Sequence, residues 1–465
     1  MDIRTKLTEA AGERLISGLL KYIEKDPDRN MVNILDAVEK YAGRLIPERL
    51  KPGLRRGAED PTNVYHRYIV DLFTGLDRNV LVSMGRALGV DAAYLGTKTL
   101  RANRAKYDCN IPWLILMDPT SACNLRCTGC WAADYNKAQN LTLDEMRDII
   151  RQCKELGTHV FMFTGGEPLI RKDDILTLCE ENRDCAFLAF TNATLIDQAL
   201  CDRMLKTGNL ALALSIEGTK QSNDERRGEG TYDKTVGAME LLKKNRLLYG
   251  ISVCYTREND EFVTSDEFLD KMIDAGAMFA MYFNYMPVGK NATADLIPTP
   301  EQRAYMYKWI RKVRDPHTGK KIFLFDFQDD GEYVGGCIAA GRNYFHINSA
   351  GDIEPCVFIH FADANIRTDT ILEALKKPLF TAYYRGQPFN DNHLRPCPML
   401  ENPHLLRKMI ADTGARSTDF IAEESVDELC RKCDSFAYEW APVADDIWNS
   451  TVHKKTTTRY YRDTH

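Results

Sequence analysis

Six strand–helix units in a row, a helical N-terminal segment and a cysteine-rich last third predict an α/β protein. We expect a partial (β/α)6 TIM-like barrel with an N-terminal helical domain and a small C-terminal domain. The expected bounds are 1–108 for the helical domain, 109–325 for the barrel, 326–450 for the C-terminal domain and 451–465 for a polar tail.

In the N-terminal segment, apolar residues recur at every third or fourth position, which is the period of a helix packed on one side. Three helices are predicted in this way, at about 7–23, 31–45 and 64–73. They are amphipathic and slightly basic. We therefore expect them to form a packed helical domain, to cap a barrel mouth or to contact a membrane surface.

In the barrel segment, short apolar runs alternate with amphipathic helices. Such runs are typical of a parallel sheet that helices cover on its faces. Thr142 and Glu145 form a capping box that opens the first helix. Because eight units close a full barrel, six indicate a partial one. The expected strands are 113–117, 159–163, 186–190, 210–216, 251–255 and 279–285, and the expected helices are 143–156, 173–181, 197–206, 232–244, 265–275 and 300–313.

The composition is that of an ordinary globular protein, because 44% of the 465 residues are apolar and 28% are charged. The net charge of −6 argues against a general nucleic-acid binder. The sequence has no run of ~20 apolar residues and no signal-type start, which predicts a cytoplasmic protein. In a reducing compartment, fourteen cysteines indicate metal ligation or catalysis rather than disulfides.

The most informative stretch holds three of these cysteines, Cys123, Cys127 and Cys130. Three thiolates this close can wrap one face of an iron–sulfur cube, which usually has four cysteine ligands. One iron is then open for a substrate or cofactor, as in catalytic metal sites. A zinc knuckle is the alternative, and it would need a fourth cysteine or histidine close by. We predict the iron–sulfur cluster.

This triplet, with its CxxxCxxC spacing, resembles the motif of the radical S-adenosylmethionine (SAM) superfamily. The resemblance implies a [4Fe–4S] cluster that binds SAM at its open iron. One departure concerns the position before the third cysteine, where the family often has an aromatic residue. Here that position is Gly129, and Trp131 follows the cysteine instead.

Other positions at predicted strand ends fit the same family. A GGEP motif follows the second strand, and in the family it holds the SAM amino group. A hydroxyl and a carboxylate after the fourth strand resemble the ribose-binding pair, and two further positions fall where the family contacts the methionyl and adenine portions. The matching residues are Gly165, Gly166, Glu167 and Pro168 for the motif, Ser215 and Glu217 for the ribose, and Asn192 and Met286 for the remaining contacts.

The C-terminal cysteines begin with Cys337 and then Gly351, four residues before Cys356. This order resembles the opening of the SPASM/Twitch extension, which carries auxiliary iron–sulfur clusters. Five cysteines suffice for one cluster and not for two. The resemblance therefore implies one auxiliary [4Fe–4S] cluster on Cys337, Cys356, Cys397 and one of Cys430 and Cys433, and a structural zinc on the same residues is the alternative.

The resemblance implies an enzyme that cleaves SAM reductively to a 5′-deoxyadenosyl radical. That radical abstracts hydrogen from an unactivated C–H bond, leading to bond formation, dehydrogenation or epimerisation. The expected partners are a reductant such as flavodoxin or ferredoxin and a substrate that is either a peptide or a lipid or other small molecule. The alternative is a non-catalytic iron–sulfur protein for electron transfer or cluster assembly.

Overall fold

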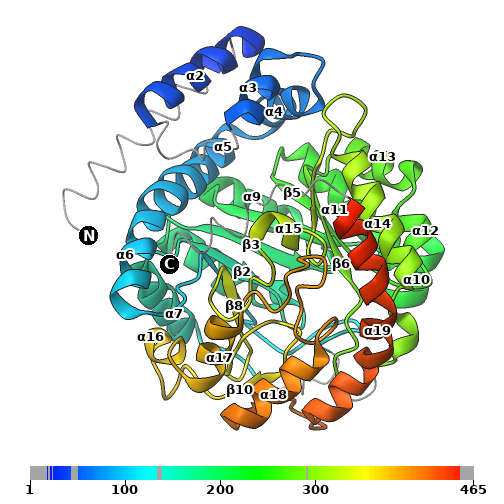
Figure 1. Cartoon of the computed structure of the whole chain (residues 1–465). Helices are drawn as coiled ribbons and strands as arrows, with labels where there is room; N and C mark the ends of the chain where they lie inside the picture. The colour runs from blue at the N-terminus through cyan, green and yellow to red at the C-terminus, as the bar shows by residue number, and fades with distance from the viewer. Residues whose placement is uncertain are drawn as a thin grey trace.

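The computed structural model describes residues 18, 21–23, 25–42, 51–132, 139–289 and 292–450 (Figure 1). Most of the helix expected at 7–23 and the expected polar tail, 451–465, lie outside the described residues. In Figure 1 the N-terminal helices, in blue to cyan, lie along one side of a central sheet, and the C-terminal helix, in red, lies at the other.

The described N-terminal part is helical, as predicted. Asn63 and Asp77 accept hydrogen bonds from backbone N–H groups in the first turns of two of these helices, which fixes where they begin. The elements are α2 (Pro27–Ala42), α3 (Lys51–Glu59), α4 (Val64–Gly75), α5 (Arg78–Gly85), the π-helix η2 (Arg86–Gly96) and α6 (Thr97–Tyr107).

The barrel segment alternates strands and helices, as the sequence predicts. The predicted capping box is present, because Thr142 and Glu145 each accept from the other's backbone N–H. The strands are β1 (Leu114–Met117), β2 (Val160–Phe163), β3 (Ala186–Thr191), β4 (Leu210–Ser215), β5 (Tyr249–Tyr255), β6 (Phe279–Asn284) and β7 (Phe323–Asp326). Between them lie α7 (Leu143–Leu156), η3 (Pro168–Arg171), α8 (Lys172–Glu181), α9 (Gln198–Thr207), α10 (Lys220–Arg227), α11 (Thr231–Lys244), α12 (Asp260–Val263), α13 (Asp266–Ala275), η4 (Ala294–Leu296) and α14 (Pro300–Val313).

The sheet has nine strands in the order β7-β6-β5-β4-β3-β2-β1-β8-β9. Eight of them are parallel, because β8 (Tyr344–Ile347) pairs with β1 in the same direction, and β9 (Ile353–Glu354) is antiparallel to β8. This confirms the partial barrel and adds two parallel strands, β7 and β8, to the predicted six. Since β7 and β9 are the two edges, the barrel is open.

The two faces of the barrel strands differ in their exposure. Phe161 and Leu212 point outward against the helices and are fully buried. The alternate residues face inward, and several of them are partly exposed, among them Met162 on β2 and Phe190 on β3. The rings of Phe190 and Phe283 lie 5.9 Å apart although β4 and β5 separate their strands, so this contact crosses the barrel.

The N-terminal helices cover the amino end of the barrel strands. Met84 and Ala87, from α5 and η2, form an apolar cluster with Ala186 at the start of β3 and Ala211 on β4. Asn79 adds a hydrogen bond of 2.8 Å to the carbonyl of Leu205. Of the three roles expected for these helices, the structure shows capping of the barrel. No helix in the described part of the chain is long and apolar enough to span a bilayer.

The region after β7 is irregular, as predicted, and it contributes β8 and β9 to the barrel sheet. Buried Arg303 of α14 joins it to the barrel through Asp329 and Glu401, at 2.9 and 2.6 Å. The boundary expected at 325 falls within β7 and stays a prediction. The other elements are α15 (Gly331–Val334), β10 (Phe361–Ala362), α16 (Ile371–Ala374), α17 (Pro378–Gly386), α18 (Pro403–Thr413), β11 (Arg416–Ser417) and α19 (Val426–Ser450).

Candidate active site

Cys123, Cys127 and Cys130 lie on the loop that leaves the carboxyl end of β1, and all three are partly exposed. Burial raises the pKa of the Cys130 thiol to about 11, and the nearby thiols of Cys127 and Cys123 add to this shift. The three thiols therefore lie close enough to influence one another electrostatically. Metal binding deprotonates such thiols, and their close approach suits a shared cation centre.

The two glycines of the GGEP motif place the cysteine loop. Gly166 donates its N–H to the carbonyl of Thr120 at 3.0 Å, and Glu167 donates its N–H to that of Ala122 at 2.8 Å. A Cβ atom on Gly166 would lie 2.1 Å from the Ala122 oxygen, so only glycine allows this approach. Gly165 has a positive φ of 102°, and a Cβ atom on it would lie 2.7 Å from the Thr120 oxygen. The predicted close backbone approach is thus made to the cysteine loop itself.

The Glu167 carboxylate is almost fully buried at the end of β2. One oxygen accepts from the Leu169 N–H at 2.9 Å and the Thr191 hydroxyl at 2.7 Å, and the other accepts from the Asn192 N–H at 2.7 Å. Burial raises the pKa of Glu167, and these three donors oppose the shift. A carboxylate has about four acceptor positions, so one remains on Oε2 for a ligand. Pro168 follows as the first residue of η3.

Asn192, at the end of β3, ties a third strand end to the cysteine loop. Its side-chain N–H donates to Oδ1 of Asn124, between the first two cysteines, at 2.8 Å. Asn124 in turn donates to the hydroxyl of Thr194 at 2.8 Å. The Asn192 side chain, which the resemblance places at the methionyl portion of SAM, therefore also holds the cysteine loop in place.

Ser215 ends β4, and buried Glu217 follows it. Glu217 Oε1 pairs with Arg226 at 2.6 Å and with Arg227. Burial opposes ionisation, but the two guanidinium groups outweigh it and lower the pKa of Glu217. Its other oxygen, Oε2, is buried and has no hydrogen-bond partner among the described residues. An acceptor left in this way fits a ligand hydroxyl such as that of a ribose.

Sequence reasoning did not single out Arg226, which holds the cysteine loop from α10. Its Nε donates to the carbonyl of Thr128 at 3.2 Å, and its own carbonyl accepts from the Thr128 N–H at 2.8 Å. The Arg226 guanidinium also opposes the rise in the pKa of Cys130 that burial causes. A signal was present in the sequence, because two consecutive arginines follow Glu217 within ten residues. Met286, also predicted, is buried just after β6.

The C-terminal cysteines come from separate elements, and four of them lie near enough to the Tyr383 phenol to affect its ionisation. Burial raises the pKa of Tyr383 well above its ordinary value, and the thiols of Cys337, Cys356, Cys397 and Cys430 raise it further. The Tyr383 hydroxyl is buried without a hydrogen-bond partner in the described part of the molecule. Four thiols around an unpaired donor fit an iron–sulfur cluster, whose sulfur atoms accept such bonds.

Cys433 lies one helical turn after Cys430 on α19, and both are fully buried. Glu401 supports this region, because it accepts from the Cys397 N–H at 2.6 Å while it pairs with Arg303. The two C-terminal candidates are thus neighbours on one face of α19.

The zinc alternatives require closely spaced ligands, because four thiolates at 2.3 Å from one zinc lie roughly 3.8 Å apart. Among the described residues, one group offers three possible metal-ligand atoms that lie within 4.8 Å of one another. It consists of His159, Asp184 and Cys185. Neither the triplet nor the C-terminal cysteines reach this spacing. Their wider separation suits a larger cluster better than one ion.

Between the two cysteine sets lies a buried charged group. The His346 ring contacts Asp118 at 2.9 Å and Glu354 at 2.6 Å, and all three side chains are buried. Trp131, which follows Cys130, packs edge-on against His346 with ring centroids 5.9 Å apart. This group links the end of β1 to the C-terminal region. It was not predicted from the sequence, since its members are distant in the chain.

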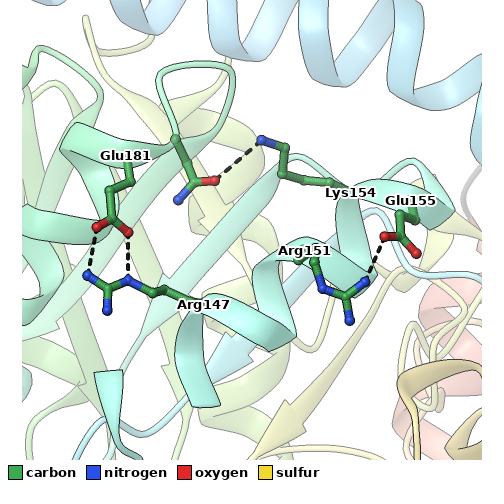
Figure 2. A pocket seen from close by; sticks show the side chains of 6 residues that line it. Arg147, Arg151, Lys154, Glu155 and Glu181 are labelled. Carbon is green, nitrogen blue, oxygen red and sulfur yellow. Dashed lines mark hydrogen bonds and ion pairs between the residues drawn. The ribbon is translucent and has the colours of Figure 1, made fainter. Parts of the chain in front are cut away.

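A surface hollow of about 370 Å³ on α7 lies away from the barrel's carboxyl end (Figure 2). Its cations are already paired: Arg147 with Glu181 at 2.7 Å and Arg151 with Glu155 at 2.7 Å (Figure 2). Lys154 contacts Asp184 at 2.8 Å. The hollow therefore offers little free charge to an anionic ligand.

Comparison with known proteins bears on the site at β1–β6. Residues 117–283 match the sequence profile of the Radical SAM superfamily. Residues 117–283 of this chain therefore form a radical SAM domain. Members of this superfamily use a [4Fe–4S] cluster and SAM, and the residues described above fit both: three gathered thiols for the cluster, and free acceptors on Glu167 and Glu217 for SAM. The non-catalytic alternative is not favoured.

Curated relatives of this radical SAM protein are enzymes. It is 25% identical over 292 residues to an AdoMet-dependent heme synthase of Methanosarcina barkeri, covering 57% of this chain and 82% of the relative. It is 28% identical over 270 residues to the mycofactocin maturase MftC of Mycobacterium tuberculosis, covering 56% and 68%. The fold resembles that of SuiB from Streptococcus suis bound to S-adenosylmethionine, with a TM-score of 0.54 and 20% identity. The match covers 70% of this chain and 79% of the SuiB chain.

Proposed function

We propose that this radical SAM protein abstracts hydrogen from an unactivated C–H bond of an organic substrate, with bond formation, dehydrogenation or epimerisation as the outcome. The observation that carries the proposal is the convergence of two strand ends and helix α10 on the cysteine loop, through Gly166, Asn192 and Arg226 respectively. When bound, the reduced cluster and SAM supply a 5′-deoxyadenosyl radical.

The chain's own residues bind and orient. Cys123, Cys127 and Cys130 would hold the cluster, and the remaining acceptor on Glu167 would receive the SAM ammonium. Glu217 Oε2 would accept from a ribose hydroxyl beside Ser215. The buried helix-facing side of the barrel and the cap at its amino end keep bulk water from entering from that side.

We propose one auxiliary [4Fe–4S] cluster on Cys337, Cys356, Cys397 and Cys430 or Cys433. The support is the four thiols around Tyr383 and the spacing that disfavours zinc. Such a cluster would accept an electron from the product radical or anchor substrate. The assignment of 326–450 as a SPASM/Twitch domain is part of this proposal.

Two substrate classes follow from the relatives and the sequence. One solved SuiB structure is bound to the precursor peptide SuiA, and its fold resembles this chain with a TM-score of 0.52, which supports a peptide. The heme synthases support a non-peptide substrate. Flavodoxin or ferredoxin is the proposed reductant, and the reducing cytoplasm is the proposed location, because free cysteine clusters survive there.

The test is anaerobic incubation of the reconstituted protein with SAM and dithionite, followed by chromatography of the products. We expect 5′-deoxyadenosine and methionine from the native protein and neither from Cys127→Ala. A native protein with a full iron content that releases no 5′-deoxyadenosine would refute the proposal.

A further inference from the structure

The inner face of the barrel is apolar and partly open. We define it by the inward-facing residues of β2, β3, β6 and β7. Lateral pairing places Met281 beside Phe325 and beside Ser252 of β5, and Ser252 beside Ser215. Phe325 is 39% exposed, whereas outward-facing Phe161 is fully buried. The apolar members are Met162, Leu188, Phe190, Met281, Phe283, Phe323 and Phe325.

The lower end of this face is closed by apolar side chains. Met84 and Ala87 of the N-terminal cap pack on Ala186, and partly exposed Leu188 packs against the same cluster. From Ala186 to Phe190 the strand rises four residues, or roughly 13 Å at about 3.3 Å each. The lower end of the inner face is therefore lined by apolar side chains.

The upper end reaches the cysteine loop through a belt of rings. Phe283 lies 5.3 Å from Phe327, Phe327 lies 6.0 Å from Phe358, and Phe358 lies 6.4 Å from Trp131. Trp131 directly follows Cys130. A substrate on the inner face therefore has one end beside the site where SAM would be cleaved.

Polar partners on this face are few. Within β2–β7 the inward-facing polar side chains are Ser215, Ser252 and Cys254, all in the upper part of the strands. The N–H and C=O groups of β2–β6 are used in the sheet, because each of these strands has a partner on both sides. A peptide main chain in the lower part would leave buried polar groups unpaired, which is costly, whereas an apolar chain gains from burial along the same path.

We propose that the inner face binds an extended apolar chain of the substrate, of the acyl or isoprenoid class, with the bond to be attacked held at the upper end. This inference rests on the proposed function and names the substrate class of the same site.

The test measures binding of radiolabelled octanoate and hexadecanoate to the anaerobically reconstituted protein with SAM, by equilibrium dialysis. We expect tighter binding of the longer chain. Leu188→Trp and Met281→Trp fill the inner face from two different strands and should weaken hexadecanoate binding at least tenfold, with a smaller effect on octanoate. Circular dichroism shows whether each variant is folded. Phe262→Ala, which alters a side chain 45% exposed on α12, is the matched control and should bind as the native protein does.

Equal binding of both acids, no binding, or hexadecanoate binding that neither tryptophan reduces would overturn the inference. So would binding of a soluble peptide of mixed sequence that both tryptophans abolish while hexadecanoate does not bind. The 5′-deoxyadenosine assay on the native protein separates the two proposals. Release of 5′-deoxyadenosine without chain binding refutes the apolar chain alone, and no release refutes the proposed function.

Discussion

Replacing His346 with glutamine is expected to destabilise the protein by about 3 kcal/mol near pH 7. The imidazole lies between two buried carboxylates, Asp118 at 2.9 Å and Glu354 at 2.6 Å. Glutamine keeps a donor for one carboxylate but removes the positive charge. Removing one partner of a buried ion pair costs about 3–5 kcal/mol, because it leaves a buried charge without compensation.

The pKa of His346 sets an upper limit to this effect. Burial alone would lower that pKa, but the two carboxylates outweigh it and raise it from 6.5 to about 10. At 1.36 kcal/mol for each pH unit, this corresponds to about 5 kcal/mol. Burial also raises the pKa of Asp118, so part of the gain offsets the cost of that buried carboxylate. We therefore expect the lower end of the range.

The pH dependence follows from the direction of the shift. A histidine whose pKa is raised on folding contributes its full stability below the unfolded value of 6.5, and the contribution is lost as the pH rises toward about 10. Urea unfolding, followed by circular dichroism from pH 6.5 to 9.5, should show the gap between native protein and His346→Gln shrinking. His159→Gln, at a histidine whose pKa burial lowers, is the control with a gap below about 1 kcal/mol. A His346→Gln gap that stays constant or widens with pH would refute the reasoning.

Three further outcomes are expected. Cys127→Ala should reduce iron from about eight toward about four per chain, on four irons per cluster, as metal analysis would show; unchanged iron would contradict the ligand assignment. Gly166→Ala, whose Cβ would lie 2.1 Å from the Ala122 oxygen, should reduce cluster incorporation, whereas Gly237→Ala, with no atom within 4 Å, should leave it unchanged. Glu167→Ala should weaken SAM binding by roughly ten- to hundredfold, since a charge-assisted hydrogen bond contributes ~1.5–3 kcal/mol; calorimetry that shows unchanged affinity would return Glu167 to a purely structural role.

Local pattern was enough to predict the six central strands. The structure places each within two residues of its expected ends, because an apolar run between amphipathic helices is a signal within a short stretch. The missed strand β7 has four residues, and its exposed residues Phe323 and Phe325 are apolar like buried Leu324, so no alternation of polar and apolar residues marks it in the sequence. The strand β8 was missed because its pairing with β1 is decided by contacts across the chain.

The candidate site shows the same division. Motif spacing predicted the cysteine triplet, and the comparisons support its family. His346 gave no such signal, because it lies 228 residues from Asp118, with which it pairs. Similarly, the four thiols that act on the pKa of Tyr383 come from α19 and three loops, and Tyr383 itself lies on α17, so only the fold brings these groups together. Groups that are paired by long-range packing leave no periodic mark in a sequence.

The hydrogen bonds of Glu167 change how its variants should be interpreted. Its carboxylate accepts from Leu169, Thr191 and Asn192, and Asn192 in turn holds the cysteine loop through Asn124. Weaker SAM binding by Glu167→Ala would therefore arise either from a lost ammonium contact or from a displaced loop. A SAM analogue without the amino group separates the two, because it removes the contact from the ligand side. If the contact exists, the variant and the analogue should have non-additive effects on binding; if the loop is displaced, the two effects should add.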